Sequence, residues 1–306
     1  MRLAMVGLGK MGGDMARRLL SEGHEVVAFD LEAARVETLA QVGAEGAASL
    51  DEAVGKLAAP RVVWLMLPAG DAPEQTLETL IRLCAEGDII IDGGNANYKD
   101  TQRRASRLRE HGLHLVDVGT SGGVWGLKNG YSLMVGGPED VVERLRPIFE
   151  TLAPAPDQGW GHVGGSGAGH FAKMVHNGIE YGLMQAYAEG LEVLRAKHEY
   201  AFDVRKVVDI WRSGSVIRSW ILELTASALS EDADLRGVSA SVPDSGEGRW
   251  MVAEAIDLDV PVPVITSALL ARLASRRRES YAGRLLVAIR HQFGGHGIAP
   301  EKHAKD

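Results

Sequence analysis

A glycine turn between an apolar strand and an amphipathic helix opens this chain and limits the folds that it can adopt. Residues 2–6 are apolar, the run Gly7-Leu8-Gly9-Lys10-Met11-Gly12 follows, and apolar side chains then recur at helical spacing. A second apolar run, 25–29, ends at Asp30. Together these are the parts of a dinucleotide-binding βαβ unit. We therefore predict that the glycine run and Asp30 bind a dinucleotide; a turn without a ligand is the weaker alternative.

The chemistry of this unit also predicts which dinucleotide binds. Glycine lets the backbone approach a pyrophosphate, and the helix N-terminus offers it N–H groups and partial positive charge. The carboxylate of Asp30 accepts hydrogen bonds from a ribose diol but repels the 2′-phosphate of NADP. Arg35 is the only basic side chain close behind Asp30. The sequence predicts NAD as the preferred cofactor.

Strand-like and helix-like segments then alternate up to about residue 152. Apolar runs at 61–67, 88–91, 113–117 and 131–137 have strand character, whereas 73–84, the segment from Tyr98, and 138–152 have helical character. This order predicts an α/β fold with a Rossmann-like doubly wound sheet over residues 1–164, ending in a Pro/Gly-rich linker at 154–165. Long helical segments from Gly169 onward predict an all-helical substrate-binding and oligomerisation domain over 165–306.

Three loops follow predicted strands where ligands of a doubly wound sheet bind. Leu67-Pro68-Ala69 is expected beside the cofactor, and Asn95 is expected where the cofactor meets the substrate. Beyond Asp117, the glycine-rich turn at 119–123 places Ser121-Gly122-Gly123 where backbone N–H groups could hold a carboxylate. Plain turns without a ligand are the alternative for these loops, and for Ser121-Gly122-Gly123 it is equally well supported.

The segment 169–184 is predicted to be a helix with chemistry on one face. Lys173, His176, Asn177 and Glu180 recur at i, i+3, i+4 and i+7, so a base, two hydrogen-bonding groups and an acid share that face. Lys173 and Glu180 lie roughly 10 Å apart along the axis, close enough for both side chains to reach one small molecule. A solvated pair of charges is the alternative. Three glycines in this helix favour close approach of a backbone or a ligand.

Composition excludes several other classes of protein. The chain has 306 residues, 45% of them hydrophobic, which is enough for two domains. A formal charge of −8 argues against nucleic acid or an anionic membrane as partner, and no apolar run is long enough to span a bilayer. Because the first strand begins at once, we expect no signal peptide and a cytoplasmic protein. The single cysteine, Cys84, excludes an intrachain disulfide, and no metal site is predicted.

The run from Lys173 to Gly182, with Asp92-Gly93-Gly94-Asn95 and Ser121-Gly122-Gly123, resembles the signature of the decarboxylating 6-phosphogluconate dehydrogenases, specifically the short NAD-type branch within the β-hydroxyacid dehydrogenase superfamily. The resemblance implies an NAD-dependent enzyme of the pentose phosphate pathway or gluconate metabolism that converts 6-phospho-D-gluconate to ribulose 5-phosphate and CO2. It implies that Lys173 and Glu180 are the catalytic pair. The substrate ligands that it implies are Asn95, Ser121, Gly122, Gly123, His176 and Asn177 for the sugar acid, and Tyr181, Arg272, Arg290 and His296 for its phosphate.

The chain also departs from the longer branch of that family. Ser245 stands where the longer branch has a lysine, Val124 stands where it has an acid, and a second helical repeat is missing. The missing repeat predicts a homodimer or homotetramer with active sites shared between subunits. Two alternatives remain: a dehydrogenase of a smaller β-hydroxy acid such as 3-hydroxyisobutyrate, which needs no phosphate ligands, and a non-catalytic dinucleotide sensor that binds a partner protein.

Overall fold

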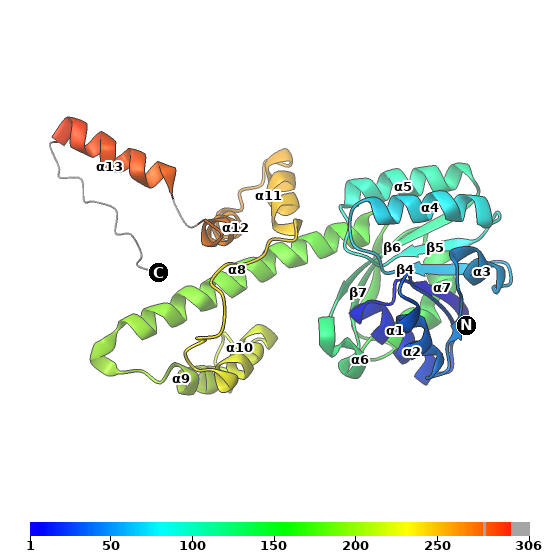
Figure 1. The fold of residues 1–306 in the computed structure, drawn as a ribbon, viewed down its shortest axis with the longest axis horizontal. Coiled ribbons are helices and arrows are strands. Elements are labelled where there is room, and N and C mark those ends of the chain that lie inside the picture. Colours follow the sequence, from blue (N-terminus) through cyan, green and yellow to red (C-terminus); the bar gives the residue numbers. More distant parts are fainter. Residues whose placement is uncertain (278–279, 295–306) are drawn as a thin grey trace. The chain divides into compact units, whose positions relative to one another are not determined.

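The computed structural model describes residues 1–277 and 280–294 and divides the chain into two compact units, Met1–Gly178 and Ile179–Asp306 (Figure 1). One long helix, α8 (Ala168–Ala196), belongs to both units. The domain boundary predicted from the sequence, between residues 164 and 165, stays a prediction.

The first unit is built on a single mixed sheet of eight strands in the order β3-β2-β1-β4-β5-β6-β7-β8. All neighbouring strands are parallel except β6 and β7. The order reverses between β1 and β4, which makes their carboxyl ends the switch point of a doubly wound sheet, as predicted. The strands are β1 (Arg2–Val6), β2 (Glu25–Phe29), β3 (Glu45–Gly46), β4 (Val62–Leu65), β5 (Ile89–Asp92), β6 (His114–Ser121), β7 (Ser132–Gly136) and β8 (Trp160–Gly164).

Helices cover both faces of this sheet and bury an apolar core on each (Figure 1). Side chains of α1, α2 and α7 pack on one face, and side chains of α3, α4 and α5 pack on the other. The strands buried on both sides are nearly continuous apolar runs, as parallel strands usually are. The helices of this unit are α1 (Lys10–Ser21), α2 (Ala33–Ala40), α3 (Leu50–Gly55), α4 (Asp71–Leu83), α5 (Tyr98–Glu110), α6 (Gly126–Asn129) and α7 (Glu139–Leu152), with a 3₁₀ turn, η1 (Gly123–Trp125).

Two sequence-based expectations about this sheet are wrong. Residues 160–164, expected in a linker, form the edge strand β8, which pairs with β7 despite its glycines. The expected turn at 119–123 begins later, because β6 continues through Ser121 and pairs with β7 over its last residues. Pairing with β7 satisfies the backbone of this glycine-rich segment, which local sequence alone assigns to a turn.

The second unit is helical, as predicted. Val208, Leu222, Ala226 and Leu229 form one small core with the C-terminal half of α8, and Tyr181, Ala268 and Leu269 form another. Its elements beyond α8 are η2 (His198–Tyr200), α9 (Val204–Trp211), α10 (Trp220–Glu231), α11 (Glu247–Asp257), α12 (Pro263–Ser275) and α13 (Tyr281–Gly294).

Two smaller findings bear on the function classes. No helix in the described part of the chain combines the length and apolar character needed to cross a membrane. Cys84 is half-buried, and burial together with the nearby Asp88 carboxylate raises the pKa of its thiol to about 11. A thiol with that pKa is unreactive at neutral pH, as expected for a structural cysteine.

Candidate active site

The glycine turn between β1 and α1 is shaped by close backbone approach. Gly7 has a φ of +90°, and a Cβ at Gly12 would lie 2.1 Å from the carbonyl oxygen of Gly7. Gly9 differs, because no heavy atom lies within 4 Å of the position that its Cβ would occupy. No side chain caps α1, which begins at Lys10. No side-chain cap therefore competes with an anion for the N–H groups of its first turn.

Asp30 lies beside this turn, at the end of β2. Its Oδ2 accepts a hydrogen bond from the Leu8 N–H at 2.6 Å, and its Oδ1 accepts one from the Glu32 N–H at 2.9 Å. Burial alone would raise the pKa of Asp30, but these two hydrogen bonds and the Arg35 guanidinium outweigh it and lower the pKa. Asp30 is thus held as a carboxylate next to the glycine turn. Arg35 contacts both Asp30 and Glu32, at 3.4 and 2.8 Å.

The loops after β4 and β5 are in backbone contact. A Cβ at Gly94 would lie 2.3 Å from the carbonyl oxygen of Leu67, and a Cβ at Gly93 would lie 2.2 Å from Nε1 of Trp64. Leu67-Pro68-Ala69 and Asn95 are therefore neighbours. Asn95 itself is exposed, whereas the Ala96 that follows it is buried. Asn97 then caps α5, because its Oδ1 accepts a hydrogen bond from the Lys99 N–H at 2.9 Å.

The start of α8 is fixed to the middle of β6 by a buried carboxylate. Asp117 is fully buried, and its two oxygens accept hydrogen bonds from the N–H groups of Gly167 at 2.7 Å and His170 at 2.9 Å. Backbone packing adds to this, since a Cβ at Gly119 would lie 2.5 Å from both the Gly169 carbonyl oxygen and Cβ of Lys173. Gly169 is thus a glycine of close backbone approach, as predicted, whereas Gly182 makes only ordinary contact with Val264.

Lys173 projects from α8 next to this junction. Its Nζ donates to Oδ1 of Asn177 at 2.8 Å and lies 3.3 Å from Nδ1 of His176. Nδ1 of His176 and Oδ1 of Asn177 lie within hydrogen-bond distance of each other as well, at 3.1 Å. Lys173 and His176 are half-buried and Asn177 is buried. This arrangement differs from a solvated surface pair, and it puts a basic nitrogen with two fixed polar partners beside β6.

Ser121, Gly122 and Gly123 lie where β6 ends. Ser121 is its last residue, Gly122 and Gly123 have φ values of +130° and +51°, and a 3₁₀ turn follows. Both glycines are in backbone conformations that other residues rarely adopt. Gly119, two residues earlier on β6, packs against Lys173 of α8. The strand therefore places the lysine near the predicted carboxylate-binding turn.

The predicted phosphate ligands belong to the second unit. Tyr181 is 6% exposed, and among the described residues its hydroxyl has no hydrogen-bond partner. The Arg272 guanidinium lies 3.7 Å from the Tyr181 ring centroid and donates to the Pro243 carbonyl oxygen at 2.8 Å. Arg290 is exposed on α13, and His296 lies outside the described residues. Glu180 lies on α8 in the second unit, which begins at Ile179. Its role as a catalytic acid stays a prediction.

Ser245, which replaces a lysine of the longer branch, has a different partner. Its hydroxyl donates to Oε2 of the buried Glu247 at 2.5 Å. The hydroxyl is therefore engaged with a carboxylate and supplies no positive charge.

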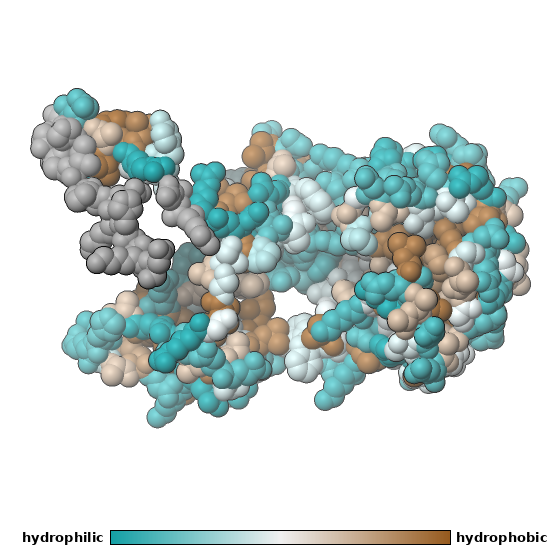
Figure 2. All heavy atoms as spheres, viewed as in Figure 1, coloured by the Kyte–Doolittle hydropathy of each residue, from teal (hydrophilic) through white to brown (hydrophobic). Residues whose placement is uncertain are grey.

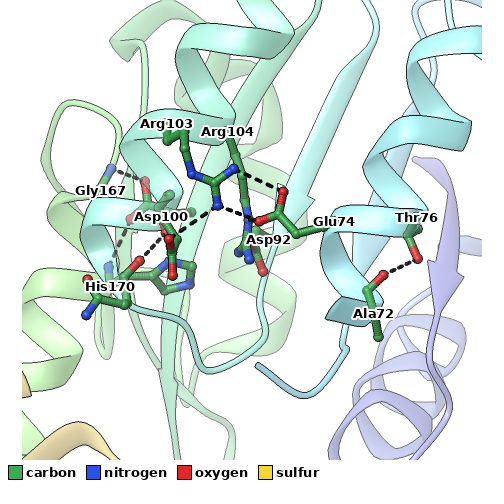
Figure 3. Close-up of polar contacts among 12 residues, drawn as sticks. Ala72, Glu74, Thr76, Asp92, Asp100, Arg103, Arg104, Gly167 and His170 are labelled. Carbon is green, nitrogen blue, oxygen red and sulfur yellow. Dashed lines mark hydrogen bonds and ion pairs between the residues drawn. The ribbon is translucent and has the colours of Figure 1, made fainter. Parts of the chain in front are cut away.

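Three charged residues near the candidate site were missed by the sequence analysis. Asp92, the last residue of β5, pairs with Asp117 in the middle of β6, and both are buried. Arg104 of α5, also buried, pairs with Asp92 at 3.0 Å (Figure 3). The sequence does show an acid after each of these two apolar runs, which could have indicated a functional carboxylate. The partners of both acids lie on other elements, so no local pattern predicts them.

The sheet order, the glycine turn and the acid after β2 define a Rossmann-type dinucleotide-binding protein. The family model described as the NAD binding domain of 6-phosphogluconate dehydrogenase matches residues 2–164, and the model of that enzyme's C-terminal domain matches residues 169–289. The chain belongs to the 6-phosphogluconate dehydrogenase family. The resemblance identified from its motifs is confirmed.

Individual relatives agree with this assignment. The NAD(+)-dependent, decarboxylating 6-phosphogluconate dehydrogenase of Haloferax volcanii is 45% identical over 300 residues, covering 98% of this chain and 99% of the relative. The structure of Plasmodium falciparum 6-phosphogluconate dehydrogenase matches with a TM-score of 0.82 at 26% identity, covering 100% of this chain and 67% of that chain. Mycobacterium tuberculosis 3-hydroxyisobutyrate dehydrogenase shares the fold, with a TM-score of 0.71 at 23% identity over 87% of this chain and 90% of that chain.

Proposed function

We propose that this protein is an NAD-dependent dehydrogenase that oxidises and decarboxylates 6-phosphogluconate to ribulose 5-phosphate and CO2. The observation that carries the proposal is the hydrogen-bonded cluster of Lys173, His176 and Asn177 on α8, in the same unit as the dinucleotide-binding turn. The similarity to the Haloferax volcanii enzyme over nearly the full length of both chains supports the same reaction and the same cofactor.

The glycine turn fits a dinucleotide. Room at Gly9 and the uncapped N-terminus of α1 suit a pyrophosphate, and the ionised Asp30 suits a ribose diol. The loop Leu67-Pro68-Ala69 and Asn95 would hold the remainder of the cofactor. When bound, NAD accepts the hydride from C3 of the sugar acid.

Lys173 handles the proton of the C3 hydroxyl. The side chains of Asn177 and His176 hold its amine in place, so that the amine takes the hydroxyl proton as hydride departs. Oxidation produces a β-keto acid, whose carboxylate leaves as CO2. Lys173 then acts as the acid toward the C3 oxygen, which stabilises the enediol, and Glu180 protonates C1.

The remaining predicted ligands bind the two ends of the substrate. Asn95 and Ser121-Gly122-Gly123 hold the sugar acid, with N–H groups of the glycine turn directed at the carboxylate. Tyr181, Arg272, Arg290 and His296 bind the phosphate. The buried hydroxyl of Tyr181, which has no hydrogen-bond partner within the described part of the chain, supports this role, because buried polar atoms usually have partners and a phosphate oxygen supplies one.

The dehydrogenase of a smaller β-hydroxy acid and the non-catalytic sensor are the alternatives. The test measures absorbance of reduced nicotinamide when the enzyme is mixed with NAD or NADP and either 6-phosphogluconate or 3-hydroxyisobutyrate. We expect turnover with 6-phosphogluconate. Faster turnover of 3-hydroxyisobutyrate would favour the smaller substrate, and no signal with any pair would favour the sensor.

The preference for NAD over NADP follows from Asp30. Repulsion between its carboxylate and a 2′-phosphate should amount to roughly 1–3 kcal/mol, or about one to two decades in kcat/KM. Arg35 is already shared between Asp30 and Glu32 and offers limited compensation. We expect Asp30→Asn to reduce the difference in kcat/KM between NAD and NADP. Asp51→Asn, which alters an exposed acid on α3, should leave that difference unchanged. Equal kcat/KM values for the two cofactors in the parent enzyme would contradict this account.

The proposed enzyme is a cytoplasmic homo-oligomer whose subunits share their active sites. Helix α13 exposes Leu285, Leu286, Val287 and Ile289, and Figure 2 shows apolar surface on this helix. Exposed apolar surface of this kind suits contact with a second copy of the chain. Arg290 on the same helix would then serve the active site of the neighbouring subunit.

Mixed oligomers test this sharing. Because one hybrid site would hold both intact groups, combining Lys173→Met subunits with Arg290→Ala subunits should restore part of the activity that each lacks alone. Combining Lys173→Met with Asn177→Ala should restore none through this route, because both changes lie on α8 beside the same lysine. Hetero-oligomers of the first pair that remain as inactive as their parents would refute the shared site.

A further inference from the structure

A chain of ion pairs, with Arg104 and Asp92 buried and Glu74 partly exposed, connects α4, α5 and the end of β5. Glu74, in the first turn of α4, accepts a hydrogen bond from Nε of Arg104 at 2.8 Å, while NH1 of Arg104 donates to Oδ2 of Asp92 at 3.0 Å (Figure 3). Arg104 is 4% exposed and Asp92 is 2% exposed. Arg103 also binds Glu74, and together with Arg104 it lowers the pKa of Glu74 to about 2. Glu74 is therefore a carboxylate at neutral pH.

The two carboxylates of this chain adjoin the two loops assigned to cofactor and substrate. Asp92 is followed by Gly93, Gly94 and Asn95. Glu74 lies just beyond Leu67-Pro68-Ala69, since α4 begins at Asp71. The fork of Arg104 therefore joins the base of one loop to the base of the other, and a lysine with a single nitrogen could not match both positions as well.

Close packing leaves these loops little freedom to adjust separately. Gly94 abuts the Leu67 carbonyl and Gly93 abuts the Trp64 indole, so displacement of either loop forces the other to move. Asn95 is exposed, and its two neighbours in the sequence are the closely packed Gly94 and the buried Ala96. A small shift in Asp92 would thus be transmitted to the Asn95 amide.

We propose that Arg104 is a positioning residue that, through Asp92 and Glu74, holds Asn95 and the cofactor loop at the separation needed for hydride transfer. The inference rests on the proposed function. Arg104 touches no substrate, and its effect on the reaction passes through Asn95. A misplacement of about 1 Å at a reacting centre costs on the order of 10²-fold in rate.

The same strand offers a matched control. Arg61 pairs with Asp88 at 3.0 Å, and the Asp88 side chain is 1% exposed. Asp88 directly precedes β5 and therefore lies at the opposite end of this strand from Asp92. Arg61→Lys therefore perturbs a second Arg–Asp pair with a buried carboxylate, away from both loops, although the Arg61 side chain itself is 24% exposed.

The experiment is a double-mutant cycle in kcat/KM for 6-phosphogluconate at saturating NAD. Arg104→Lys should lower kcat/KM by on the order of 10²-fold in the parent enzyme but by less than about threefold in an Asn95→Ala background, because the group that it positions is already gone. Arg61→Lys should change kcat/KM by less than about threefold in both backgrounds, even where it lowers Tm. The Glu74 side chain is 30% exposed and therefore less critical for folding. Glu74→Gln should lower kcat/KM about three- to tenfold, again only when Asn95 is present.

Two outcomes would overturn the inference. One is a double variant whose loss of kcat/KM equals the product of the two single losses, when Arg104→Lys or Glu74→Gln is combined with Asn95→Ala. The other is a loss from Arg61→Lys as large as that from Arg104→Lys, which would indicate a general effect on the sheet. Either result in an active parent enzyme contradicts the positioning role alone, whereas absence of turnover in the parent contradicts the proposed function as well.

Discussion

Lys173→Met lowers kcat with 6-phosphogluconate and NAD by about 10²–10⁴-fold or more, because a positioned general base contributes that much and this lysine has two proton transfers to perform. Methionine keeps the length of the side chain and removes the amine that contacts Asn177 and His176. The Kd for NAD should change by less than about twofold, since the dinucleotide-binding turn is on other elements. Steady-state kinetics and a binding titration check both values.

Lys206→Met is the control for this result. Lys206 is exposed on α9, so its loss should leave kcat within about twofold of the parent value. Turnover of Lys173→Met close to that of the parent would contradict the assignment of the base. A large loss of NAD affinity in the same variant would show that the substitution acts through the fold of the first unit.

Gly119→Ala should reduce turnover by on the order of 10²-fold, because the added methyl group forces α8 away from β6. Its Cβ would lie 2.5 Å from the Gly169 carbonyl oxygen and from Cβ of Lys173, and neither can yield without moving the helix. The strain should also cost roughly 1–3 kcal/mol of the free energy of unfolding. Kinetics and chemical denaturation measure the two effects.

Gly161→Ala provides the comparison for that variant. Gly161 is also a strand residue of the same sheet, but nothing lies within 4 Å of its Cβ position. Its substitution should leave turnover within about twofold of the parent. Parent-like activity of Gly119→Ala would mean that the start of α8 tolerates displacement and does not fix Lys173.

The sequence predicted the fold well because its determinants are local and repeated. Apolar runs such as Ile89–Ile91 are long enough to indicate buried parallel strands, and helical periodicity after Gly169 is continuous. The alternation of the two patterns then restricts the topology to a doubly wound sheet. The edge strand β8 was not predictable in this way, because Gly161 and Gly164 resemble a linker and only pairing with β7 makes that segment a strand.

The candidate site was predictable where residue types recur at fixed spacing. The glycine turn, Asp30 and the Lys173-His176-Asn177 face were all proposed from spacing, because a βαβ unit or a single helix brings their residues together. Interactions between distant segments left no such pattern. Asp117 binds N–H groups about 50 residues later, and the partners of Arg104 come from two other elements. Such pairs depend on the topology of the sheet, which brings strand ends and helix starts together.

The central claim, NAD-dependent oxidation coupled to loss of C1, is tested most directly by the stoichiometry of the reaction. The enzyme is given NAD and 6-phosphogluconate carrying an isotopic label at C1, and NADH, labelled CO2 and the sugar product are quantified together. The account predicts equimolar NADH and labelled CO2, with ribulose 5-phosphate as the product. NADH formed without release of labelled CO2, or no NADH at all, would contradict it.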